Sequence, residues 1–255
     1  MNIYSLPAFT DNYIWALVEG TQCWVVDPGQ AAPVERFLAT HQLHLEGVLI
    51  THHHGDHTGG IAELAHHRKL RVIGPDNPAI TGITETVCEG DSITLLGVTL
   101  HCLAVPGHTL DHVAYHGETG SRHVVFCGDT LFAGGCGRLF EGTPSQMWHS
   151  LNKLANLPDR TEVYAAHEYT TANLAFAAAV DPDNTQLQAR IEDVAACRAH
   201  GIATLPSTIG LEKATNPFLR AAQPALQHAA AVASGEAHSC HDAVFAALRA
   251  YKDRF

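Results

Sequence analysis

The sequence lacks both paired cysteine motifs and long apolar segments. Its seven cysteines are an odd number, lie far apart, and include no C-x-x-C pair, which favours reduced thiols over a disulfide framework. No segment approaches the roughly 18 consecutive apolar residues of a membrane span. The first residues also lack the basic and apolar regions of a signal peptide. We therefore expect a cytoplasmic protein with no membrane partner.

Positive charge is also scarce. The chain has 15 Lys and Arg against 26 Asp and Glu, a net charge of -11, which argues against a general surface for nucleic acid or anionic lipid. An anionic ligand would have to meet a local basic patch. The length of 255 residues and the 46% hydrophobic content are typical of a globular protein with one large domain, or a larger and a smaller one.

The sequence lacks the residues for a phosphate-binding loop and for a cysteine nucleophile. The segment Gly134 to Gly137 is rich in glycine but has no following Lys-Ser/Thr pair, so it predicts a tight turn and not a phosphate-binding loop. Cys136 has no nearby base in the sequence that would activate it as a nucleophile.

The segment from Thr51 to Gly60 is where potential metal ligands gather. It reads T-H-H-H-G-D-H-T-G-G and follows the apolar run that ends at Ile50. In an extended segment His52, His54 and Asp56 project to one side and His53 to the other. Imidazole and carboxylate ligands without thiolate suit zinc, iron or manganese at an open site. Because these ligands are too many for one ion, the pattern favours two ions over a polar surface loop in a His-rich chain.

Three further candidate ligands follow predicted strands. The predicted strands Val98 to Val105, His123 to Cys127 and Glu162 to Ala166 are followed closely by His108, Asp129 and His167. Ligands of α/β proteins gather beyond the carboxyl ends of strands. A histidine or aspartate in such a place is often only a structural or turn residue. Together, however, they complete a predicted ligand set of seven: His52, His54, Asp56, His57, His108, Asp129 and His167. His112 is a candidate for orienting these ligands.

The predicted secondary structure changes near residue 170, from mainly strands to helices. Before it we predict mainly strands, at Ile3 to Leu6, Tyr13 to Val18, Gln22 to Val26, Val48 to Ile50, Arg71 to Gly74 and Ser92 to Leu96, with helices near Ala32 to His41 and Ile61 to His67. After it we predict Ala- and Leu-rich helices at Leu174 to Val180, Gln186 to His200, Pro224 to Ala233 and His241 to Ala250. The expected domains are therefore 1–169, an α/β domain that contains all seven candidate ligands, and 170–255, a smaller helical domain.

These motifs resemble the metallo-β-lactamase fold superfamily and, within it, the glyoxalase II (hydroxyacylglutathione hydrolase) family. The resemblance rests on T-H-x-H-x-D-H, F-C-G-D-T-L-F, the G-G-C-G-R-L-F-E-G-T loop, A-H-E-Y-T and the terminal K-D-R-F. It covers nearly the whole chain. The resemblance implies an αββα sandwich followed by an all-helical C-terminal domain.

The resemblance also implies how the ligands divide. His52, His54 and His108 would hold one divalent metal, and Asp56, His57 and His167 the other. Asp129 would bridge both, so Asp56 and Asp129 are the expected catalytic carboxylates. Zinc is the first choice for both ions, with iron and manganese as alternatives.

The resemblance implies a substrate site as well. The residues expected to contact the glutathione thioester are Arg138, Phe140, His167, Tyr169, Arg249 and Lys252. Arg249 and Lys252 lie three residues apart on one predicted helix face and can bind a carboxylate. The alternative for this pair is a solvated C-terminal turn. Arg138 stands where many relatives have Lys, Phe140 where some have Tyr, and Asp111 where Gly is common.

The reaction implied is hydrolysis of S-(2-hydroxyacyl)glutathione, such as S-lactoylglutathione, in methylglyoxal detoxification. A hydroxide activated by two metals would attack the thioester, giving a 2-hydroxy acid such as lactate and glutathione. The resemblance leaves two alternatives: a glutathione persulfide dioxygenase with a single iron, and a non-catalytic metal-binding protein of the same fold. The expected enzyme is a monomer.

Overall fold

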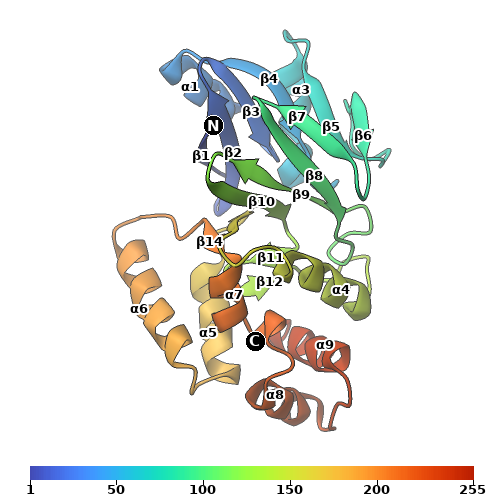
Figure 1. Cartoon of the computed structure of the whole chain (residues 1–255), viewed down its shortest axis with the longest axis vertical. Helices are drawn as coiled ribbons and strands as arrows, with labels where there is room; N and C mark the ends of the chain where they lie inside the picture. The colour runs from blue at the N-terminus through green and yellow to red at the C-terminus, as the bar shows by residue number, and fades with distance from the viewer. The chain divides into compact units, whose positions relative to one another are not determined.

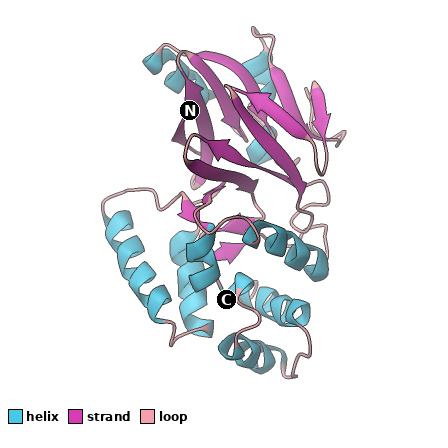
Figure 2. Cartoon of the chain, in the orientation of Figure 1, coloured by secondary structure: helices cyan, strands magenta, loops and turns pink.

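Strands dominate the first half of the chain and helices the second (Figure 2). The computed structural model describes all residues from 1 to 255. It forms two units: Met1–Ala104 with Asp111–Gly128, and Val105–Leu110 with Asp129–Phe255. The second unit thus includes residues well before position 170. The expected domain boundary near residue 170 stays a prediction.

The first unit contains a mixed six-stranded sheet. Its strands, in spatial order, are β1 (Asn2–Ala8), β2 (Asn12–Glu19), β3 (Gln22–Val26), β4 (His44–Leu49), β5 (Arg71–Pro75) and β6 (Glu85–Val87). The first three pair antiparallel, and β3 to β6 pair parallel. Helix α1 (Ala31–His41) links β3 to β4, α2 (Gly55–Thr58) and α3 (Ile61–Ala65) link β4 to β5, and a loop links β5 to β6.

Both faces of this sheet are buried. On β2, Ile14 and Ala16 belong to a core cluster with residues of α1 and α3, including Val34 and Leu64. Because side chains alternate along a strand, Trp15 points to the opposite face, and it is buried as well. A sheet buried on both faces needs a layer on each side.

The second layer of this unit is an antiparallel set of four strands. Its spatial order is β10 (Arg122–Gly128), β9 (Val113–Thr119), β8 (Val98–Ala104) and β7 (Ser92–Leu95). Tyr115 on β9 is fully buried and its hydroxyl donates to the carbonyl of Ile50, at 2.7 Å. This bond ties the second layer to the end of β4, where the His-rich segment begins.

The second unit is mainly helical (Figure 1). Its elements are the hairpin β11 (Leu131–Phe132) and β12 (Gly135–Cys136), α4 (Pro144–Ala155), the pair β13 (Glu162–Ala165) and β14 (Ser207–Thr208), α5 (Thr170–Val180), α6 (Thr185–Ala199), α7 (Ile209–Thr215), the 3-10 turn η1 (Pro217–Leu219), α8 (Pro224–Ser234) and α9 (His241–Lys252). Helices α8 and α9 lie side by side at the C-terminal end.

The predicted helices after residue 170 and the predicted strands are confirmed, with ends shifted by a few residues. Helices α4 and α7 and strand β9 are among the elements that were not predicted. No helix in the structure is both long enough and apolar enough to span a bilayer.

Candidate metal centre

The ligand segment of the first unit begins directly after β4. His52 and His57 are completely buried, while His54 and Asp56 are partly buried. The ring of His52 lies 4.7 Å from that of His54 and 4.1 Å from that of His57, centroid to centroid. His57 Nε2 lies 3.5 Å from Asp56 Oδ2. Four predicted ligands are therefore brought together in this unit.

The extended conformation expected for this segment is wrong from residue 55 onward. Gly55–Thr58 forms the short helix α2, closed by the amides of His57 and Gly59 bonding to the carbonyls of His54 and Gly55. Asp56 and His57 therefore lie on one helical turn and not on alternate faces of a strand. His53 turns aside as expected, and its Nδ1 lies 3.0 Å from the carboxylate of Asp111.

Asp27 orients this ligand segment, although it is not among the site residues predicted from the sequence. Its carboxylate accepts hydrogen bonds from the backbone amide and hydroxyl of Thr51, at 2.8 and 2.7 Å. Asp27 Oδ2 also lies 3.0 Å from Nδ1 of His57. When a carboxylate accepts a hydrogen bond from the Nδ1–H group of His57, Nε2 carries no proton and can act as a ligand atom.

Thr51 extends this orientation to His52. The Thr51 hydroxyl donates its one hydrogen bond to Asp27, so its oxygen can accept a hydrogen bond from Nδ1 of His52, 3.1 Å away. Nε2 of His52 is then the atom that could ligate a metal ion. His112 is buried and stacks on His52 with ring centroids 4.5 Å apart, so it lies beside this predicted ligand.

The second unit holds the other three predicted ligands, with two histidines on the carboxylate of Asp129. Asp129 Oδ2 lies 3.4 Å from His108 Nε2, and Asp129 Oδ1 lies 3.4 Å from His167 Nε2. All three side chains are buried. Each carboxylate oxygen thus faces a different imidazole, an arrangement that suits a carboxylate shared by two cations.

The glycine-rich loop supports this second set. The carbonyl of Arg138 accepts from Nδ1 of His108 at 2.8 Å, which leaves Nε2 directed at Asp129. Gly137 packs against the backbone of Asp129, because a Cβ built on it would lie 2.0 Å from the Asp129 carbonyl oxygen. Only glycine fits there.

Two predicted substrate residues are aromatic and lie against the ligands of this unit. The exposed ring of Phe140 meets that of His108 edge to face, with centroids 5.2 Å apart. Tyr169 stacks on His167 with centroids 4.7 Å apart and an interplanar angle of 7°. Both rings leave part of their surface to solvent.

The basic residues of the second unit differ in accessibility. The side chain of Arg138 is 62% exposed, and its Nε lies 3.2 Å from Asp253 Oδ1. Arg249 is buried and donates to the Cys136 carbonyl at 2.9 Å and to the same Asp253 oxygen at 3.1 Å. Lys252 is half-buried, with Nζ 5.2 Å from the centroid of the Phe176 ring.

The surroundings of Lys252 disfavour its charged form. Burial, assisted by the neighbouring positive charge of Arg249, lowers its pKa to about 8. In contrast, burial raises the pKa of the Cys136 thiol, and Arg249 only partly opposes this. Cys136 is therefore a poor nucleophile, as the sequence indicated.

The donor set of these residues fits divalent metal ions. Each of the seven predicted ligands belongs to a group of His and Asp side chains that could hold an ion. None is a thiolate, and the imidazoles of His57 and His108 have Nδ1 bonded to an oxygen acceptor, as in oriented metal ligands. The residues thus support divalent metal binding, and zinc, iron and manganese all accept such ligands.

Comparisons with known proteins cover the whole chain. The model described as "Metallo-beta-lactamase superfamily" matches residues 9–167, and the model described as "Hydroxyacylglutathione hydrolase C-terminus" matches residues 168–255. The hydroxyacylglutathione hydrolase of Pseudomonas putida is 53% identical over 258 residues and that of Photobacterium profundum 51% identical over 257, each covering all of both chains.

Solved structures show the same fold. ETHE1 from Myxococcus xanthus gives a TM-score of 0.64 at 27% identity, covering 85% of this chain and 84% of its own. TTHA1623 in a di-iron-bound form gives 0.61 at 25% identity, covering 86% of this chain and 100% of its own. The expected α/β sandwich with a C-terminal helical part is confirmed. This chain belongs to the hydroxyacylglutathione hydrolase family of the metallo-beta-lactamase superfamily.

Proposed function

We propose that this protein is a thioester hydrolase that converts S-(2-hydroxyacyl)glutathione into a 2-hydroxy acid and glutathione. The observation that carries the proposal is the full-length similarity, at about 50% identity, to proteins named for this activity. The helical C-terminal family match supports it, because it covers the part of the chain that holds Tyr169, Arg249 and Lys252.

We propose further that the seven ligands form one centre for two metal ions. One ion would be held by His52, His54 and His108, and the other by Asp56, His57 and His167, with Asp129 on both. The two oxygens of Asp129, each facing one imidazole, support its bridging position. Zinc is the proposed metal, with iron and manganese as alternatives.

A pair of such ions would supply Lewis-acid activation of a water molecule and of the thioester carbonyl. The chain's own residues set the conditions for this chemistry. Asp27 and the Arg138 carbonyl hold the tautomers of His57 and His108. No cysteine nucleophile is required, and a glutathione thiolate is a good leaving group without a dedicated protein acid.

The glutathione moiety would lie against the exposed residues of the second unit. Phe140 and Tyr169 offer partly exposed rings beside His108 and His167. Arg138 and Lys252 offer cations for the glutathione carboxylates. Arg249 is buried against Cys136 and Asp253. We therefore propose that it contacts glutathione from this buried position and not from the open surface.

A direct assay tests the activity. Purified protein given S-lactoylglutathione should release one thiol for each thioester consumed. The alternative dioxygenase would instead consume oxygen when given glutathione persulfide. Oxygen uptake without thioester cleavage would overturn the proposed function, and metal-loaded protein that cleaves no glutathione thioester would favour a non-catalytic protein.

Lys252 gives a prediction about pH. Its charged form prevails below the pKa of about 8, so the ammonium that binds a carboxylate is mostly present at pH 7 and mostly lost at pH 9. We expect the inhibition constant of S-methylglutathione, which has no thioester, to rise severalfold between these values.

Two variants isolate this effect from titration of the ligand itself. Lys252→Ala should bind weakly at both pH values and show only the ligand's own pH dependence. Lys252→Arg keeps its charge across this range and should bind without the extra loss at pH 9. Equal pH profiles for the wild type and Lys252→Ala would show that Lys252 does not bind the carboxylate.

Three further expectations remain proposals. We propose a boundary between the catalytic domain and the helical substrate-binding domain near residue 170, a monomeric protein, and a cytoplasmic location. None of the seven cysteines forms a disulfide in the structure, which supports a reducing compartment.

A further inference from the structure

The hairpin β11–β12 of the second unit has its backbone polar groups bound by buried side chains from distant parts of the chain. Asn216 Nδ2 donates to the carbonyls of Phe132 and Gly135, at 3.2 and 2.9 Å. Asn173 Nδ2 donates to the carbonyl of Ala133 at 3.1 Å. These bonds satisfy groups that a short, buried hairpin cannot pair within itself.

Glu212 accepts hydrogen bonds from both the hairpin and the surrounding helices. It is completely buried. Its Oε2 accepts from the amide of Gly134 at 2.8 Å and from Asn216 Nδ2 at 3.0 Å. Its Oε1 accepts from Arg190 Nη2 at 2.5 Å and from the hydroxyl of Ser207. One carboxylate therefore joins the tip of the hairpin to α6, β14 and α7.

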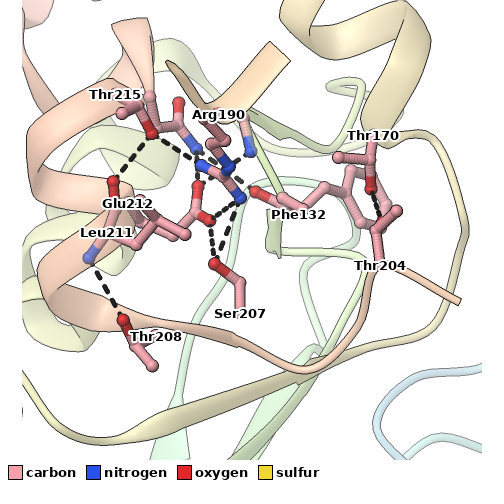
Figure 3. A network of polar contacts seen from close by, with 12 residues as sticks. Phe132, Thr170, Arg190, Thr204, Ser207, Thr208, Leu211, Glu212 and Thr215 are labelled. Atoms are coloured by element: carbon pink, nitrogen blue, oxygen red, sulfur yellow. Dashed lines mark hydrogen bonds and ion pairs between the residues drawn. The ribbon is translucent and has the colours of Figure 1, made fainter. Parts of the chain in front are cut away.

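The network around Glu212 requires an acceptor with no proton of its own. Arg190 is also buried, and it donates to Thr215 Oγ1 at 2.6 Å and to Ser207 Oγ at 3.1 Å. Figure 3 shows the two side chains facing each other, with Ser207 and Thr215 beside them. With its proton donated to Glu212, Ser207 accepts from Arg190. All four partners of Glu212 are donors, which an amide in its place could not match.

The hairpin leads directly into the supports of two predicted metal ligands. Gly137 follows β12 and packs on the backbone of Asp129, and its amide bonds to the Thr130 carbonyl at 3.3 Å. The next residue, Arg138, places its carbonyl on Nδ1 of His108. A shift of the hairpin tip would therefore move the contacts that orient both Asp129 and His108.

We propose that Glu212 is a positioning residue for the metal centre: by fixing Gly134 and Asn216, it sets the course of the hairpin and hence the orientation of His108 and Asp129. It touches neither substrate nor metal. The inference rests on the metal ligands proposed above. It assigns a role in metal binding to a buried carboxylate of the helical region.

The test is a two-site titration of metal-depleted protein with Zn²⁺ in competition with a chromophoric chelator, which needs no enzyme activity. In Glu212→Gln one donor must face an amide NH₂ group. We expect its affinity for at least one of the two ions to fall about tenfold, the lower end for residues that orient metal ligands. Thr208→Ala is the matched control, because it removes the cap on Leu211 in the same helix, α7, without touching the hairpin. It should lower the unfolding temperature but leave both affinities within about twofold.

A second variant covers the case in which Glu212→Gln does not fold. Asn216→Ser keeps the Arg190–Glu212 pair and a side-chain oxygen to cap Phe218, but its side chain is too short to reach Phe132 and Gly135. It should weaken Zn²⁺ binding in the same direction. Wild-type affinities in Asn216→Ser, or in a folded Glu212→Gln, would overturn the inference while leaving the proposed function intact. A wild-type protein that binds none of Zn²⁺, Fe²⁺ and Mn²⁺ would overturn the proposed function itself.

Discussion

Replacing Asp129 by asparagine is expected to lower kcat/KM for S-lactoylglutathione by at least about 1,000-fold, a loss of about 4 kcal/mol of transition-state stabilisation. The two carboxylate oxygens face His108 and His167 at equal distances of 3.4 Å. An asparagine would present an NH₂ group to one of them and would carry no negative charge to share between two cations. Metal analysis of the same variant should show fewer than two ions per chain.

The matched control is Asp181→Asn, the same substitution at another buried aspartate of the second unit. Asp181 accepts from Arg220 Nε at 3.1 Å and belongs to no predicted ligand set. This variant should lose thermal stability, because the Arg220 pair is weakened, yet keep kcat/KM within a few fold. A fully active Asp129→Asn would remove Asp129 from the centre.

Replacing Asp27 by asparagine is expected to weaken metal binding about 100-fold, the upper end for residues that orient ligands. Asp27 bonds to three groups at once, the amide and hydroxyl of Thr51 and Nδ1 of His57. An amide NH₂ in its place would compete with one of these donors. The tautomers of both His52 and His57 would then no longer be fixed. Competition with a chelator measures the affinity directly.

Asp111→Asn serves as the control for Asp27. Asp111 bonds to His53, the one histidine of the segment that is not a predicted ligand, and to Asn77. Its replacement changes a carboxylate–histidine pair of similar geometry, so metal affinity should stay within about twofold. Should Asp27→Asn and Asp111→Asn have the same small effect, Asp27 would have no special part in orienting ligands.

The signals that predict the seven metal ligands are local in the sequence. A histidine or aspartate that follows a strand of apolar residues is visible without any knowledge of tertiary contacts, as for His108 and Asp129. The Ala- and Leu-rich helices after residue 170 are equally readable. Helix α4 was missed although its start carries a local signal, the capping box of Thr143 and Gln146 with Pro144 between them.

The residues that orient the ligands could not be found in this way. Asp27 lies in an Asp-Pro-Gly turn, and only the fold shows that its carboxylate reaches Thr51 and His57, 24 and 30 residues away. Glu212 lies 78 residues from Gly134. The prediction that side chains alternate between two faces is wrong at Asp56, because backbone hydrogen bonds between residues 54 and 59 close a helical turn there.

The most direct test of the two-metal centre is the metal content of the purified chain, followed through removal and restoration. Elemental analysis should find two divalent ions per chain. A chelator should abolish cleavage of S-lactoylglutathione, and back-titration with Zn²⁺ should restore it fully only at the second equivalent. Full thioesterase activity with one ion per chain, or with none, would contradict the account.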